Sequence, residues 1–189
     1  MKKCTSQGLV LLLALLTLLA ALPARAQQAR LSDIVVTNTS EHLIVYFSVE
    51  DCYTSEMLQA IESGIPTTFT FYTHLYVKRD FWWDRKIADL EVQHTVRYDP
   101  LKKRYAVRLS EKEGEVLLVE DFEEARRLMS EVVGLEVAPL GLLEKGKQYQ
   151  LRMMVELDKI RLPLSLHQVL FFLSLWDFKT DWYAVDFLY

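Results

Sequence analysis

Residues 67–78, TTFTFYTHLYVK, decide the fold because apolar and polar side chains alternate along them. Successive side chains of an extended strand point to opposite faces of the sheet. The face toward the core would carry the apolar residues Phe69, Phe71, Leu75 and Val77. The opposite face would carry Thr68, Thr70, Tyr72, His74, Tyr76 and Lys78. The pattern predicts a half-buried β-strand.

The same period of two recurs in four further segments. These segments are residues 42–49, 88–98, 105–109 and 149–157. Weaker strand patterns occur at residues 31–37, 115–119, 135–138 and 182–187. Residues 99–103 separate two of the strong segments and are typical of a hairpin turn, because Pro100 presets a turn dihedral and Asp99 can accept backbone hydrogen bonds.

Two segments break this period and are typical of helices. Thr54 or Ser55 can cap a first helix, which Gly64 and Pro66 would end. A second apolar stripe runs from Phe122 to Val133, with acidic residues at its start and Gly134 at its end. Regularly spaced strands with only two short helices predict a mainly β protein, an antiparallel β-sandwich of immunoglobulin-like or similar type.

Residues 1–26 have the three parts of a secretory signal peptide: two early lysines, an apolar run from Leu9 to Leu22, and Ala24-Arg25-Ala26 as a small-residue cleavage site. The run is shorter than the roughly 18 residues that span a bilayer, which favours cleavage over retention as an anchor. Residues 27–189 would then form a single β-sandwich domain. We therefore expect an exported protein without a transmembrane span after cleavage.

Loss of Lys2, Lys3 and Arg25 would leave 19 of the 22 basic residues against 26 acidic ones. The excess of acidic residues argues against nucleic acid as a partner, because binding to phosphate backbones needs an extensive basic surface. Cys4 would leave with the signal peptide, and Cys52 alone cannot form an internal disulfide.

The sequence contains none of the common catalytic motifs, including nucleophile elbows, phosphate-binding glycine loops and zinc-binding helices. His74 and His94 fall on opposite faces of their strands if these pair in one sheet, which disfavours a shared metal. We expect no enzyme, no catalytic residue, no cofactor and no metal. The alternative, a hydrolase, would need a nucleophile, a base and an orienting group that converge in space, and His74 within hydrogen-bond reach of Asp84 in an open cleft would favour it.

Aromatic residues supply the candidate binding sites. Trp82, Trp83, Asp84 and Arg85 lie in a loop between two strands, where paired indoles could contact a sugar, a protein or a membrane surface. In the alternative arrangement, one tryptophan closes the end of the sandwich and the other packs under Arg85.

A second candidate is the polar-aromatic strip of Tyr72, His74 and Tyr76, which would continue to Ile44 and Tyr46 if their strands pair. Ordinary cross-strand packing is the alternative explanation of the strip. The apolar segment 164–176, ending at Trp176, and the nearby Trp182 form either core or a docking surface.

The chain resembles a family of exported proteobacterial proteins classed as domain of unknown function 4390. The residues that carry the resemblance are Leu31-Ser32-Asp33, Val45-Tyr46-Phe47, residues 64–69 (GIPTTF), Phe81-Trp82-Trp83-Asp84, and the tail from Arg161 to Trp176. The resemblance implies a small periplasmic or envelope protein of a Gram-negative bacterium, and it supplies no catalytic residue.

From these observations we expect a non-enzymatic envelope protein with an interaction or accessory role. Its partner would be an envelope protein, bound through the Trp82-Trp83 loop or the segment 164–176. The alternative is a module that binds a glycan or a lipid on the polar-aromatic strip. The oligomeric state and the identity of the partner are not determined by the sequence.

Overall fold

The computed structural model describes residues 29–112, 115–158 and 179–189, and it is mainly β. A three-stranded antiparallel sheet has the order β1-β2-β7. Its strands are β1 (Arg30–Asn38), β2 (His42–Glu50) and β7 (Glu131–Pro139). The six-stranded antiparallel sheet has the order β6-β5-β4-β3-β8-β9. Its strands are β3 (Thr67–Val77), β4 (Arg85–Asp99), β5 (Arg104–Leu109), β6 (Val116–Val119), β8 (Gln148–Leu157) and β9 (Tyr183–Leu188).

The two sheets pack their apolar faces together, which confirms the predicted antiparallel β-sandwich. Phe47 of β2 meets Phe71 of β3 edge to face, with ring centres 5.8 Å apart. Phe69, Phe71 and Leu75 are fully buried, as the alternation along residues 67–78 predicts. Burial of each such side chain stabilises the fold by about 2 kcal/mol relative to exposure, so this alternation sets the core face of the sheet.

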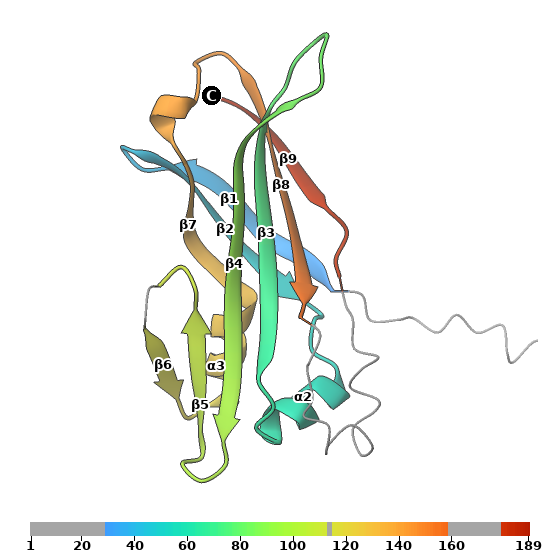
Figure 1. The fold of residues 1–189 in the computed structure, drawn as a ribbon, viewed down its shortest axis with the longest axis vertical. Coiled ribbons are helices and arrows are strands. Elements are labelled where there is room, and N and C mark those ends of the chain that lie inside the picture. The colour runs from blue at the N-terminus through green and yellow to red at the C-terminus, as the bar shows by residue number, and fades with distance from the viewer. Residues whose placement is uncertain (1–28, 113–114, 159–178) are drawn as a thin grey trace, which may run out of the picture.

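The longest elements are β3 and β4, which run along most of the molecule (Figure 1). They pair from Thr67 with Val96 to Val77 with Arg85. The loop that joins them, residues 78–84, projects from one end, and the loop of Asp99–Lys103 lies at the other end (Figure 1). Asp99 Oδ1 accepts hydrogen bonds from the backbone N–H groups of Leu101 and Lys102, at 3.0 and 3.1 Å, which confirms the predicted hairpin turn.

The helices lie toward the end of the molecule opposite the projecting loop (Figure 1). Helix α2 (Ser55–Glu62) begins after Thr54, whose hydroxyl accepts a hydrogen bond from the N–H of Met57. Helix α3 (Phe122–Ser130) begins after Asp121, whose carboxylate accepts from the N–H of Glu124. Both caps satisfy an N–H group that the first helical turn leaves unpaired. A short 3-10 turn, η1 (Leu140–Leu142), follows β7.

The predicted end of the second helix is wrong. The helix ends at Ser130, and Val132 and Val133 belong to β7, where Val132 pairs with Phe47 of β2. Gly134 does not cap the helix but sits inside the strand with φ of +67°, beside the ring of Tyr46 and next to a register shift. Both valines are β-branched, which favours a strand once a neighbouring strand can pair with them.

Candidate binding surface

The tip of the β3–β4 hairpin, residues 79–84, exposes three consecutive aromatic side chains. Phe81, Trp82 and Trp83 are 93%, 77% and 92% exposed. The arrangement in which one tryptophan closes the sandwich and the other packs under Arg85 is therefore wrong. The hairpin carries the loop beyond both sheets (Figure 1). The exposure of these rings makes the hairpin tip a candidate contact surface.

Asp84 anchors the hairpin tip to the sheet. Its carboxylate accepts hydrogen bonds from Nζ of Lys78 at 3.2 Å and from the backbone N–H of Arg79 at 3.4 Å. Nη2 of Arg152, on β8, lies 3.7 Å from Asp84 Oδ2. These contacts join the two ends of the loop to a neighbouring strand, so the aromatic rings are presented from a braced hairpin.

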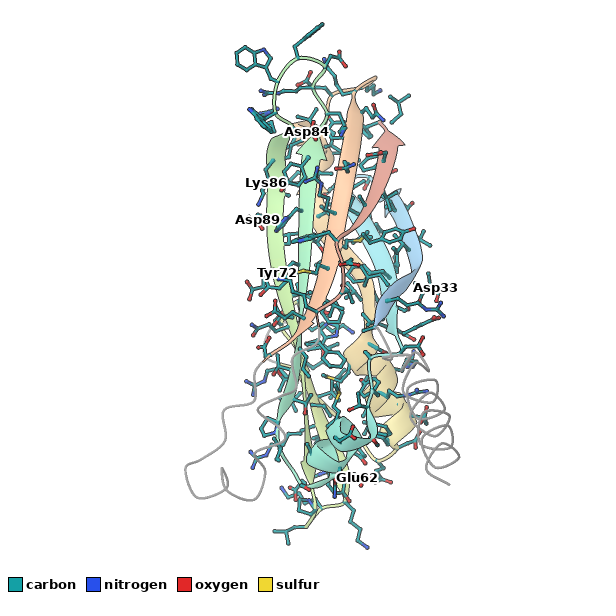
Figure 2. All side chains as sticks on the ribbon, turned by 90° about the vertical axis from the view of Figure 1, so that its right-hand side faces the viewer. Asp33, Glu62, Tyr72, Asp84, Lys86 and Asp89 are labelled. Atoms are coloured by element: carbon teal, nitrogen blue, oxygen red, sulfur yellow. The ribbon has the colours of Figure 1, made fainter. Side chains whose placement is uncertain are left out.

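Tyr72, His74 and Tyr76 lie on the outward face of β3, as the alternation predicts, and each is half-buried. Strand pairing sets His74 between Asp89 of β4 and Arg152 of β8, which in turn pairs with Ala184 of β9. The next row comprises Lys86, Tyr76, Gln150 and Asp186. Figure 2 shows Asp84, Lys86, Asp89 and Tyr72 following one another, in that order from the top, along this side of the molecule.

His74 forms the centre of this face. Its Nε2 lies 2.9 Å from Asp89 Oδ1, and Nζ of Lys86 donates to Asp89 Oδ2 at 2.8 Å. Burial lowers the pKa of His74 below its ordinary value, although the charge of Asp89 acts in the opposite direction. A neutral imidazole is therefore favoured near neutral pH, with Asp89 as its hydrogen-bond acceptor.

Aromatic and cationic groups stack around His74. The ring of Trp182 lies 4.6 Å from the His74 ring, and the guanidinium of Arg152 lies 4.4 Å from the centre of the Tyr76 ring. His74, Tyr76, Arg152, Trp182 and Ala184 line an open hollow of about 480 Å³, which we call the outward hollow. Cation–π contacts of this kind hold planar side chains in a fixed arrangement.

The structure brings together most of the predicted site residues. Trp182 joins the strip of Tyr72, His74 and Tyr76, and Asp84 links that strip to the hairpin tip through Arg152. Trp176 and the whole segment 164–176 lie outside the described residues. Sequence reasoning missed Lys86, Asp89 and Arg152, although the alternation within residues 88–98 and 149–157 places Asp89 and Arg152 on the polar faces of their strands.

The proposed extension of the strip to Ile44 and Tyr46 is wrong. Both residues belong to β2, in the three-stranded sheet, whereas β3 pairs with β4 and β8. The order of strands along the chain did not indicate that β3 pairs with β8, because β8 lies more than seventy residues after β3 in sequence. The outward face therefore takes its polar neighbours from β4, β8 and β9.

The geometry gives no support to the hydrolase alternative. His74 pairs with Asp89, while Asp84 is engaged by Lys78 and Arg152. Cys52 lies beside a second hollow, of about 720 Å³, but its thiol is buried, and burial raises its pKa to about 12. A thiol in that state is protonated and a poor nucleophile.

His94 is fully buried in the core and is separate from His74. Its Nδ1 lies 3.2 Å from the carbonyl oxygen of Met129, and its Nε2 lies 2.9 Å from Glu111 Oε1. Within residues 29–112, 115–158 and 179–189, no three His, Cys, Asp or Glu side chains converge as a metal site would require. No helix in these same ranges is long and apolar enough to cross a membrane.

Comparison with known proteins places the chain in a family. No curated protein and no solved structure matches it. The model of one family, described as domain of unknown function (DUF4390), matches residues 26–186, which include the hairpin tip and the outward hollow. The match extends over most of the 189 residues, so the chain belongs to the DUF4390 family.

Proposed function

We propose that this protein is an exported, non-enzymatic component of the bacterial cell envelope that works by contact with another envelope component. The observation that carries the proposal is the row of exposed rings at the hairpin tip, Phe81, Trp82 and Trp83. Tryptophan and other large aromatic side chains contribute strongly to binding energy because each removes a large apolar area from water. Exposure of three large aromatic side chains in water does not stabilise the fold, which favours a role for them in binding.

Separate features support the binding role of the tip and the export of the protein. The contacts of Asp84 with Lys78 and Arg152 restrict the loop, so little conformational entropy is lost when the rings become ordered against a partner. The N-terminal signal pattern and the family resemblance support export to the periplasm. N-terminal sequencing of protein isolated from the periplasm checks this part, with Gln27 as the expected first residue.

A photo-crosslinking experiment in living cells tests the role of the tip. A photoreactive amino acid replaces Trp83 in one variant and Leu101, at the tip of the opposite hairpin, in the control. Leu101 is 94% exposed, which matches the exposure of Trp83. We expect a specific adduct with an envelope component from position 83 and none from position 101. Identical adduct patterns at both positions would refute the proposal.

A second candidate function, favoured by the outward hollow, is binding of a small ligand such as a glycan or a lipid headgroup. Trp182, Tyr76 and His74 supply ring surfaces, and Arg152 supplies hydrogen-bond donors. Native mass spectrometry of protein purified from its own host tests this function. We expect a co-purified ligand that is lost from Trp182→Ala, and a ligand-free spectrum of the unaltered protein would count against it.

A further inference from the structure

The aromatic tip is framed by basic side chains, although the whole chain is acidic. Residues 78–86 include Lys78, Arg79, Arg85 and Lys86 against two acidic residues, whereas the chain has 22 basic and 26 acidic residues in total. Lys147, from the turn before β8, lines the same surface hollow as Phe81 and Trp82. Positive charge is thus concentrated at the end of the molecule where the rings are exposed.

The acidic residues of the tip offset this charge only in part. The carboxylate of Asp84 is already engaged by Lys78 and approached by Arg152, which leaves Asp80 as the other acidic residue of the loop. Arg79 uses its backbone N–H to bind Asp84, and its side chain takes no part in that bond. Lys86 is likewise bound to Asp89 of β4, so Arg79, Arg85 and Lys147 supply the cationic rim that a partner meets around the apolar rings.

We propose that the hairpin tip docks on an anionic lipid surface. This inference rests on the proposed function and identifies the envelope component as membrane lipid. Indole rings favour the boundary between headgroups and hydrocarbon, and each Lys or Arg near an anionic bilayer contributes about 1 kcal/mol of attraction. The tip supplies both kinds of group within one short loop and its neighbouring turn.

The size of the tip favours a lipid surface over a protein partner. Each of the three aromatic side chains offers roughly 150–250 Å². Their total area is therefore below the ~800 Å² that each side of a stable protein interface buries. Shallow insertion into a bilayer needs no matching surface, so a small protruding tip suffices. In this orientation β3 and β4 point the tip at the membrane, and α2 lies at the far end of the molecule (Figure 1).

Vesicle binding by the chain that begins at Gln27 tests the inference. This chain contains every described residue and lacks the apolar run of Leu9–Leu22, which would insert by itself. Vesicles of phosphatidylglycerol mixed with phosphatidylcholine are compared with vesicles of phosphatidylcholine alone. Co-sedimentation measures the affinity, and tryptophan emission reports whether the indoles enter the bilayer.

The variants separate the contributions of rings and charges. The double variant Trp82→Ala/Trp83→Ala should bind mixed vesicles about a hundredfold more weakly, because it removes most of the insertable area. The double variant Arg79→Gln/Lys147→Gln should lose roughly thirtyfold on mixed vesicles, and almost nothing on phosphatidylcholine alone. Leu101→Ala, at the opposite hairpin, should bind as the unaltered chain does. Circular dichroism of each variant checks that the fold is retained.

The outcomes distinguish this inference from the proposed function. Vesicle binding that survives the double tryptophan change overturns lipid docking by the tip. Absence of vesicle binding, with a protein adduct from the photoreactive group at position 83, overturns the lipid partner and leaves the proposed function standing. Absence of both vesicle binding and a specific adduct overturns both.

Discussion

Replacing Glu111 with alanine is expected to lower the free energy of unfolding by about 3 kcal/mol, because the change leaves a buried imidazole without its acceptor. His94 is 0% exposed, and its ring packs 4.7 Å from the ring of Phe71. The neighbours of its two nitrogens are the Met129 carbonyl oxygen and the Glu111 carboxylate. Loss of the Glu111 side chain therefore leaves one ring nitrogen of His94 without its hydrogen-bond partner.

The magnitude follows from what each substitution leaves behind. A charge-assisted hydrogen bond contributes about 1.5–3 kcal/mol, and a buried donor without a partner costs a further 1–3 kcal/mol. The Glu111 side chain is 18% exposed, so water can enter the vacated space and reduce the second cost. Glu111→Gln keeps an acceptor oxygen beside His94 and should cost only about 1 kcal/mol.

Chemical denaturation of the unaltered chain and of both variants, followed by circular dichroism, measures these differences. Burial acts to raise the pKa of Glu111, but hydrogen bonding and charge from His94 outweigh it and lower the pKa below the ordinary value of 4.5. A carboxyl with a lowered pKa in the folded state stabilises the fold above its unfolded pKa and loses this contribution as the pH falls.

The advantage of the unaltered chain over Glu111→Gln should therefore shrink as the pH is lowered below 4.5. Two results would refute this account of the pair. One is an alanine variant no less stable than the glutamine variant. The other is a stability difference that stays constant through the acidic range.

Three smaller predictions concern the backbone, the thiol and the outward face. Gly134→Ala should lower the free energy of unfolding by about 1 kcal/mol, because the backbone φ at this position is +67°. Gly141→Ala is the control and should be nearly neutral, since no atom lies within 4 Å of the added Cβ and φ is not positive. Equal denaturation midpoints for the two variants would contradict this prediction. Cys52, with a pKa of about 12, should resist a thiol reagent in the native protein and react rapidly in denaturant, so rapid native labelling would disprove its burial. His74 should titrate below 6.5 in an NMR experiment. Asp89→Asn should lower the pKa of His74 further, because the Asp89 carboxylate favours the imidazolium. A higher His74 pKa in the Asp89→Asn variant would count against the pairing.

The sequence predicted every strand of the described structure, because alternation is a local property that burial of one face requires. Residues 67–78 predicted β3 within one residue, and even the weak pattern at 135–138 lies within β7. The second helix was predicted too long because its apolar stripe continues into Val132 and Val133. Their pairing with β2 is a long-range contact that overrides helical spacing.

The candidate site was predicted only in part. Alternation placed Tyr72, His74 and Tyr76 on the polar face of their strand, and the structure retains them there. Arg152 and Trp182 reach the same hollow from β8 and from the residue before β9, through pairings that no local pattern reveals. The exposure of Trp82 and Trp83 also escaped prediction, because it depends on how far the hairpin extends past the opposing sheet.

The sequence alone thus determined which residues face the core, where the Asp99–Lys103 turn and the start of the first helix fall, and that paired tryptophans lie between two strands. These properties depend on side-chain chemistry and on spacings of a few residues. Only the tertiary structure decided which strands become neighbours, and so which charges surround His74 and whether the tryptophans meet protein or solvent. Those outcomes depend on pairings between distant segments, whose free energy depends on the packing of the whole sandwich.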